Sequence, residues 1–391
     1  MTFEELKNLD GQYVLQTYGR SPIAIDHGTN ATLYDLDGRE YIDFAAGIGV
    51  LSIGTAHPAW QKAVADQAAK LGHISNLYYS EPYVRLAEKL CTRSGMAAAF
   101  FGNSGAEGNE GVIKLARKYS FDRYGEGRGT VITLNRSFHG RTITTLAATG
   151  QDVFHQYFFP FTEGFRRADP DMASIQEAAG YDVCAVLVEL VQGEGGVLPL
   201  DREFVHDLQK LCAERDWLFL VDEVQTGVGR TGSLFAFQQY GVQPDACSFA
   251  KGIAGGLPMG GFLVNEKCRN VLTAGTHAST FGGNPVSAAA ACAVLDVLDD
   301  DTIAQVAEKG NYIRSKIEEM ALPCLGRTRG LGLMIGVEVA EGFSNKDLCA
   351  RLNRAGLLSL TAGPGLRFLP PLTITKEEMD KGLAILKSAL S

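Results

Sequence analysis

The sequence has no excess of positive charge and no long uninterrupted apolar stretch. Its 391 residues carry 36 Lys and Arg against 45 Asp and Glu, a formal net charge of −9. This balance argues against nucleic acid as a partner, because nucleic acid requires a basic face. No run approaches the length of a membrane span, and the N-terminus MTFEELKNLD lacks the apolar core of a signal peptide. We therefore expect a cytoplasmic protein with no membrane partner.

Metal-binding cysteine patterns are lacking as well. The eight cysteines form no C-x-x-C pair and no histidine clusters with them, so we expect no zinc or other metal site. Several cysteines, such as Cys184 in DVCAVLVEL, lie inside apolar runs and are typical of small buried side chains in a reducing compartment. With 46% hydrophobic and 21% charged residues, the chain is expected to fold, and its length favours two domains.

The alternation of helical and apolar segments predicts an α/β fold. Residues 1–20 indicate a short amphipathic helix and a loop, and Asp37-Gly38 marks a hairpin turn between two short strands. From about residue 58, amphipathic helices alternate with short apolar runs, which is typical of a doubly wound domain with a mostly parallel sheet. The apolar runs are AAAFFG, GTVITL, CAVLVEL, WLFLVDE, ACSFA and GGFLVN.

The two ends of the chain are predicted to build a smaller α+β domain together. After about residue 284, two long helices precede the strand-like GLMIGVEVA and GLRFLPPLTI and a closing helix, KEEMDKGLAILKSAL. We divide the chain into an N-terminal segment of the small domain (1–55), a large α/β domain (56–284) and the C-terminal part of the small domain (285–391).

Two ionisable residues each follow a predicted strand. Asp222 ends LFLVD, where open α/β sheets bind ligands, and its carboxylate can hold a cationic ring nitrogen. Lys251 follows ACSFA, and a desolvated lysine has a lowered pKa and attacks aldehydes. Alone, each residue has an ordinary explanation: Asp222 as a helix cap, and Lys251 as a solvated lysine in a loop. Together they predict pyridoxal 5′-phosphate, which needs a lysine for its aldehyde and an acid for its pyridinium.

A phosphate site is predicted in FFGNSGAEGNEG. Ser104 and Gly105 lie in a turn and a helix begins near Ala106, so free N–H groups and the helix dipole would face an anion. An ordinary helix cap by Ser104 is the alternative. Gly108 and Gly111 lie within this helix, where each costs about 1 kcal/mol relative to alanine. Close packing against the cofactor or a partner would explain them, but the sequence alone leaves their role open.

The motif SFHGRT follows GTVITL at the same edge of the predicted sheet. Phe138 can stack on a flat cofactor ring and His139 can flank it. Arg141 carries a planar guanidinium suited to a carboxylate. In isolation, a core aromatic is a strong alternative for Phe138, and a surface ion pair is the alternative for Arg141.

Taken together, these segments resemble the class III (ornithine/acetylornithine) family of pyridoxal-phosphate aminotransferases, and within it the acetylornithine aminotransferase subfamily. The likeness extends from about residue 20 to the end of the chain. It implies a pyridoxal-phosphate transferase fold of type I, with a mostly parallel seven-stranded sheet between helices and a smaller α+β domain. It also implies an obligate homodimer with shared active sites. The motifs in the family's order are NSGAEGNEGVIKLARKY, SFHGRT, VQGEGGV, VDEVQTGVGRTG, AKGIAGGLPMGG and STFGGNP.

The resemblance implies roles for the cofactor-binding residues. Lys251 would hold the cofactor as a Schiff base, and Asp222 would partner the pyridine nitrogen. Gln225 would hydrogen-bond the ring hydroxyl, and Phe138 would stack on the ring beside His139. The residues implied to hold the phosphate are Ser104, Gly105, Ala106 and, from the second subunit, Thr280.

Substrate recognition is implied for a second set of residues. Arg141 would bind the substrate α-carboxylate, with Ser279 near the substrate and Tyr18 lining the pocket. Arg367 would bind the α-carboxylate of glutamate, and Glu194 would pair with Arg367 when the ω-amino substrate is bound. A half-buried arginine needs an anion, so an internal glutamate can serve until the substrate carboxylate arrives. From the residues alone, a structural ion pair or two unrelated surface charges would be the preferred explanation.

The implied reaction moves the δ-amino group of N2-acetyl-L-ornithine to 2-oxoglutarate, a step of arginine biosynthesis. Ornithine, succinylornithine, 4-aminobutyrate and acyl-diaminopimelate are the alternative donors within the family. Residues 45–51, AAGIGVL, contain no tyrosine where ornithine-specific relatives have one, which favours an acylated amine. Two departures from the family pattern bear on the donor, Leu190 in place of a common proline and HAST in place of HGST.

Other classes of protein share this architecture. A pyridoxal-phosphate aminomutase, racemase or decarboxylase is one alternative, and an inactive binding protein with the same fold is another. The presence of Lys251, Asp222 and Arg141 speaks against the inactive protein.

Overall fold

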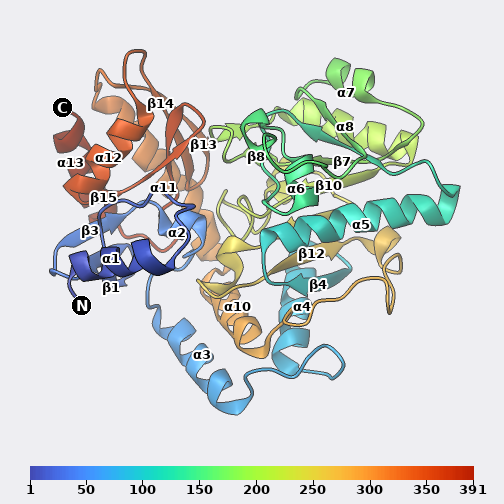
Figure 1. The fold of residues 1–391 in the computed structure, drawn as a ribbon, viewed down its shortest axis with the longest axis horizontal. Helices are drawn as coiled ribbons and strands as arrows, with labels where there is room; N and C mark the ends of the chain where they lie inside the picture. Colours follow the sequence, from blue (N-terminus) through green and yellow to red (C-terminus); the bar gives the residue numbers. More distant parts are fainter.

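The computed structural model describes residues 1–391, and a seven-stranded sheet lies at the centre of its larger part (Figure 1). The strand order is β4-β12-β11-β10-β7-β5-β6, and only β12 runs against its neighbours. The predicted fold class, with its mostly parallel sheet, is confirmed. Its strands are β4 (Ala98–Gly102), β5 (Thr130–Leu134), β6 (Phe165–Ala168), β7 (Val183–Val188), β10 (Leu218–Asp222), β11 (Ala246–Phe249) and β12 (Gly260–Val264).

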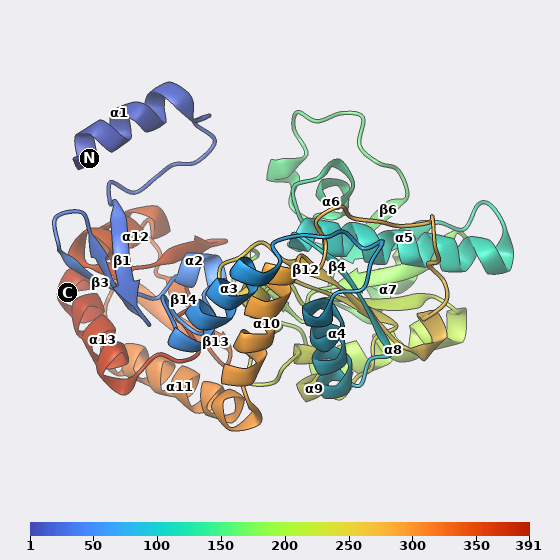
Figure 2. The same ribbon diagram turned by 90° about the horizontal axis from the view of Figure 1, so that it is seen from below.

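These strands form where the sequence is continuously apolar. Every residue of β5, β7, β10, β11 and β12 is buried, as expected for strands covered on both faces. Strand β6 was not expected, because its sequence FRRA contains two arginines, both exposed. In Figure 2, α5 and α6 lie on one side of the sheet and α4, α8 and α9 on the other. The helices of this part are α3 (Pro58–Lys70), α4 (Glu81–Ser94), α5 (Gly105–Tyr124), α6 (Ile143–Ala148), α7 (Met172–Ala178), α8 (Arg202–Arg215) and α9 (Ala236–Tyr240).

Helix α5 packs directly on strand β12. A Cβ atom at Gly108 would lie 2.5 Å from the carbonyl oxygen of Gly261. One at Gly111 would lie 2.2 Å from a ring carbon of Phe262. The role that the sequence left open is therefore close packing against a strand of the same chain, and not against the cofactor or a partner.

The two ends of the chain meet in the smaller part. Strand β3 pairs with β15 in parallel, Ile42 opposite Leu357, and extends the hairpin of β1 and β2. A second, antiparallel sheet has the order β13-β14-β17-β16. The strands are β1 (Ile25–Thr29), β2 (Thr32–Asp35), β3 (Glu40–Asp43), β13 (Leu325–Leu331), β14 (Met334–Val339), β15 (Leu357–Leu358), β16 (Leu360–Ala362) and β17 (Gly365–Phe368).

Helices complete the smaller part. The predicted strand GLRFLPPLTI ends at Phe368, because Pro370 and Pro371 have no N–H group to donate to a ladder. The N-terminal helix α1 lies apart from the body and buries none of its residues (Figure 2). No helix combines the length and the apolarity needed to cross a bilayer. The domain boundaries at 55/56 and 284/285 stay predictions. The remaining helices are α1 (Phe3–Tyr13), α2 (Ala46–Gly49), α10 (Pro285–Val297), α11 (Asp300–Glu319), α12 (Asn345–Ala355) and α13 (Lys376–Leu390), of which α10 packs on α3 and α4 of the larger part.

Candidate active site

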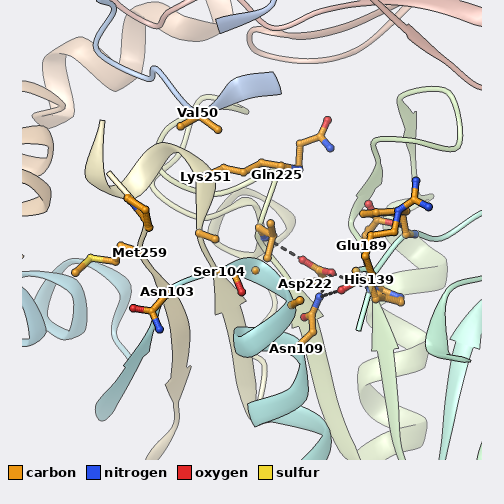
Figure 3. A pocket seen from close by; sticks show the side chains of 18 of the residues that line it. Val50, Asn103, Ser104, Asn109, His139, Glu189, Asp222, Gln225, Lys251 and Met259 are labelled. Carbon is orange, nitrogen blue, oxygen red and sulfur yellow. Dashed lines mark hydrogen bonds and ion pairs between the residues drawn. The ribbon is translucent and has the colours of Figure 1, made fainter. Parts of the chain in front are cut away.

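The carboxyl ends of the parallel strands surround a cavity of about 420 Å³ (Figure 3). Ser104 follows β4, Phe138 follows β5, Glu189 follows β7, Asp222 ends β10 and Lys251 follows β11, and all five line the cavity. Ligands of open α/β sheets bind at this edge. Four of these strand-end positions, all but Glu189, were singled out in the sequence, and they converge in one place.

Asp222 is buried in the cavity wall, and hydrogen bonds fix its carboxylate. Its Oδ2 accepts from Nδ2 of Asn109 at 2.7 Å and from Nδ1 of His139 at 2.8 Å. Its Oδ1 accepts from the backbone N–H of Val224 at 3.0 Å. Asn109 also donates to the carbonyl of His139 at 2.7 Å, so the three side chains form one rigid group.

Lys251 begins the short 3₁₀ turn Lys251–Ala254 with φ of +44°, a left-handed conformation that is uncommon for a residue with a side chain. The hydroxyl of Ser52 donates to the carbonyl of Gly252 at 2.6 Å and helps to hold this turn. Burial lowers the pKa of Lys251, and the charge of Arg367 lowers it further, while Glu194 and Asp222 oppose the shift. A larger fraction of the amine is therefore neutral and nucleophilic.

The start of helix α5 forms the opposite wall of the cavity. Ser104 caps the helix by accepting from the N–H of Glu107 at 3.2 Å, and the N–H groups of Gly105 and Ala106 have no acceptor within the helix. A Cβ atom at Gly105 would lie 2.7 Å from a methyl group of Val224, so a glycine lets the helix approach the loop after β10. Such an end binds a phosphate through its N–H groups and its dipole.

Arg367 and Glu194 lie next to the cavity and form an ion pair of 2.7 Å. The same Nη1 of Arg367 donates to Oε1 of Gln225, which lines the cavity, at 3.0 Å. The side chain of Arg367 is buried, and its Nε has no hydrogen-bond partner. The guanidinium therefore keeps one buried donor without a partner, and Glu194 is its only ionic partner.

The remaining predicted residues lie at different distances from the cavity. Arg141 lines it, and Ser279 accepts from the cavity residue Asn103 at 3.3 Å. Thr280 is exposed and does not line the cavity of its own chain. Tyr18 is 74% exposed, with Arg20 over its ring at 5.7 Å, and also lies outside the cavity.

Two cavity residues, Glu189 and Asn109, were given no role from the sequence. Glu189 is buried and accepts from the N–H groups of Phe138 at 2.9 Å and Gly193 at 3.2 Å. Burial raises its pKa above the usual range of a glutamate. Glu189 directly follows β7, and Lys251 lies shortly after β11. Because ligands bind at the carboxyl ends of parallel strands, the position of Glu189 in the sequence could have identified it as a cavity residue. Asn109 lies inside a helix, where no comparable signal exists.

The residues around the cavity fit pyridoxal 5′-phosphate. Lys251 can react with its aldehyde, the fixed carboxylate of Asp222 can hold its ring nitrogen, and Phe138 offers an aromatic face. The free N–H groups of Gly105 and Ala106 can hold its phosphate. The fold and this cavity define a pyridoxal-phosphate-dependent transferase of fold type I.

Comparison with known proteins identifies the family. Residues 13–390 match the class-III aminotransferases, and the chain belongs to this family, whose cofactor is pyridoxal phosphate. The acetylornithine aminotransferase of Haemophilus ducreyi is 49% identical over 100% of both chains. The crystal structure of ornithine aminotransferase from Toxoplasma gondii superposes with a TM-score of 0.95 at 33% identity, covering 100% of this chain and 95% of that one. Acetylornithine aminotransferase from Elizabethkingia anophelis superposes with a TM-score of 0.88 at 30% identity, covering 100% and 99%.

Proposed function

We propose that this aminotransferase moves the δ-amino group of N2-acetyl-L-ornithine to 2-oxoglutarate, forming N-acetyl-L-glutamate 5-semialdehyde and L-glutamate. The full-length identity of 49% to an acetylornithine aminotransferase supports this donor. The absence of a tyrosine from residues 45–51, of which Val50 lines the cavity, supports an acylated amine. The closeness in shape to an ornithine aminotransferase makes free ornithine the second candidate. The reaction belongs to arginine biosynthesis, and we propose that it takes place in the cytoplasm.

Bound pyridoxal phosphate supplies an aldehyde that takes up the amino group and a ring that withdraws electrons from the reacting carbon. Lys251 is the residue that holds the cofactor, and its neutral Nζ is the base that removes a proton from the δ-carbon of the donor. Asp222 keeps the ring nitrogen protonated, and Asn109 and His139 hold its carboxylate in place. Phe138, which lines the cavity, would stack on the ring.

The ion pair of Arg367 and Glu194 supports the proposal that acetylornithine and glutamate, two different amino donors, use the same site. The δ-amine of acetylornithine is attached to an uncharged methylene chain, which brings no carboxylate to Arg367. While this donor is bound, Glu194 neutralises Arg367. When glutamate presents its α-amine beside a carboxylate, that carboxylate replaces Glu194 as the anion that pairs with Arg367. Arg141, which lines the cavity, binds the α-carboxylate of acetylornithine.

A single-turnover experiment tests this reaction. Holoenzyme mixed with N2-acetyl-L-ornithine, without 2-oxoglutarate, is expected to release one semialdehyde per site and then stop, because the amino group stays on the enzyme. An aminomutase would instead return an isomerised amine and release no aldehyde. Continuous release of a product without 2-oxoglutarate would also contradict amino transfer.

We also propose that the enzyme is a homodimer in which Thr280 reaches the phosphate in the partner's site. Asn76 donates to the carbonyls of Ser279 at 3.2 Å and Gly282 at 2.8 Å, so residues 76–79 lie beside Thr280. Leu77 and Tyr79 in this segment are 87% and 99% exposed. Large apolar side chains exposed together support burial against a second subunit.

Complementation between two inactive variants tests the shared site. Dimers of Lys251→Ala and dimers of Thr280→Ala are each expected to be impaired. After their subunits are exchanged, one site of each mixed dimer combines an intact Lys251 with an intact Thr280 from the partner. Activity above that of either parent is therefore expected, and no gain after confirmed exchange would contradict a shared site.

A further inference from the structure

Arg141 has no ionic partner and lies against two aromatic rings. Its Cζ is 4.1 Å from the ring centroid of Phe154 and 5.6 Å from that of Phe138. No carboxylate of the chain lies within ion-pair distance of the Arg141 guanidinium, although the side chain is exposed. A guanidinium whose Cζ lies over a ring spends none of its N–H donors on that contact, whereas an acidic partner would occupy them.

The neighbours of Phe154 hold the turn that carries its ring. Phe154 ends the 3₁₀ turn Asp152–Phe154, in which its N–H donates to Gln151 at 3.1 Å. Asp152 forms an ion pair with Arg167 at 2.5 Å. The next residue, His155, contacts the carbonyl of Leu146 through Nε2 at 2.7 Å. The turn is therefore connected on both sides to the strand and helix beside it.

Phe154 also contacts the residue that faces the cofactor. Its ring meets that of Phe138 edge to face, with centroids 5.9 Å apart and an interplanar angle of 73°. Phe138 lines the cavity, whereas Phe154 does not. Phe154 thus stands behind two cavity residues without touching the cavity itself.

We propose that Phe154 is a positioning residue for Arg141: its ring face supports the guanidinium, so that the donor edge stays free for the α-carboxylate of the amino donor. The inference rests on the proposed role of Arg141 in binding that carboxylate. A guanidinium fixed in one plane loses less freedom when it forms a bidentate pair with a carboxylate. Without the ring, Arg141 would have several orientations, and the affinity for carboxylate-bearing donors would fall.

The test compares two donors that differ only in the carboxylate. Holoenzyme with Phe154→Leu retains an apolar side chain but loses the ring face. Its KM for N2-acetyl-L-ornithine is expected to rise roughly 3- to 30-fold, the range of a cation–π contact, with little change in kcat. The KM for N-acetylputrescine, which lacks the carboxylate, is expected to stay unchanged. Phe154→Tyr, which keeps the ring, is expected to behave as the unmodified enzyme, and so is Phe158→Leu, which removes a half-exposed ring from the same loop.

A double-mutant cycle separates this inference from the role of Arg141. In an Arg141→Ala background, Phe154→Leu is expected to add no further increase in KM for N2-acetyl-L-ornithine. An equal KM increase for both donors, or a full additional loss in the Arg141→Ala background, would overturn the positioning role. If Arg141→Ala alone leaves this KM unchanged, the proposed role of Arg141 is wrong and the inference falls with it. Comparing two donors on one sample keeps the test valid when part of the variant protein is unfolded.

Discussion

Nη1 of Arg367 lies 2.7 Å from Oε1 of Glu194 and 3.0 Å from Oε1 of Gln225. The arginine belongs to β17 of the smaller part, and both acceptors belong to loops of the larger part. Because the Arg367 side chain is only 3% exposed, its charge needs an anion nearby. An incoming substrate carboxylate must therefore compete with Glu194.

Replacing Glu194 with Gln removes the competing anion. The KM for L-glutamate in the reverse reaction is expected to fall several-fold, because the substrate carboxylate no longer displaces a charged partner. The free energy of unfolding is expected to fall by about 1–3 kcal/mol, since Arg367 loses its counter-charge. Steady-state kinetics and urea denaturation measure these effects. Glu338→Gln breaks the surface pair with Arg329 as a control and should cost less than about 1 kcal/mol. An unchanged or higher KM for glutamate contradicts the exchange of anions.

Replacing Lys251 with Ala is expected to lower turnover roughly a thousandfold or more, because the base at the reacting carbon is lost. The fold should survive, so circular dichroism should match that of the unmodified enzyme. Lys62→Ala, which removes an exposed lysine paired with Asp66, provides the control and should leave turnover unchanged. Retained turnover in Lys251→Ala would show that another group moves the proton.

Helical glycines at Gly111 and Gly11 should respond to alanine in opposite directions. A Cβ atom at Gly111 would lie 2.2 Å from the Phe262 ring, so Gly111→Ala should destabilise the protein by about 1–3 kcal/mol. At Gly11 in α1 nothing lies within 4 Å, so the same change should be neutral or stabilise by up to about 1 kcal/mol. Thermal unfolding of the two variants measures the difference. A stable Gly111→Ala variant would show that α5 can move away from β12.

The buried carboxyl of Glu223 should make stability depend on pH. It accepts from the N–H of Phe237 at 2.8 Å and from the hydroxyl of Thr226, yet burial raises its pKa from 4.5 to about 7. The folded state therefore holds this proton more tightly than the unfolded state. The protonated Glu223 therefore makes its whole contribution to the free energy of unfolding below pH 4.5. This contribution falls by about 3 kcal/mol as the pH rises to about 7.

Glu223→Gln replaces the ionisable carboxyl with a neutral amide. Its free energy of unfolding is expected to be close to that of the unmodified protein at pH 5 and to exceed it at pH 8. Urea denaturation at both values provides the measurement, with the exposed Glu341→Gln as the control. A difference between Glu223→Gln and the unmodified protein that does not change with pH would show that Glu223 does not titrate in this range.

Local patterns predicted most of the large sheet and the centre of the site. The continuous apolar runs of β7 and β10 identify them as doubly covered strands, and Asp222 and Lys251 follow from their position at strand ends. The short strand β6 could not be predicted, because its FRRA sequence is half charged and its pairing with β5 decides its conformation.

Local sequence patterns could not predict contacts between segments that are far apart in the chain. Glu194 and Arg367 are 173 positions apart, and only the family resemblance brought them together. The ring of Phe262 that requires Gly111 belongs to a strand far along the chain. Phe154 shows no pattern of its own, and its contact with Arg141 depends on how one loop folds back.

The choice of amino donor tests the proposed function most directly. The kcat/KM of the holoenzyme is measured with N2-acetyl-L-ornithine and with L-ornithine at the same fixed concentration of 2-oxoglutarate. The acetylated donor is expected to be preferred by roughly tenfold or more, because residues 45–51 offer no tyrosine to a free α-amine. A kcat/KM for L-ornithine equal to or above that for the acetylated donor would contradict the assignment.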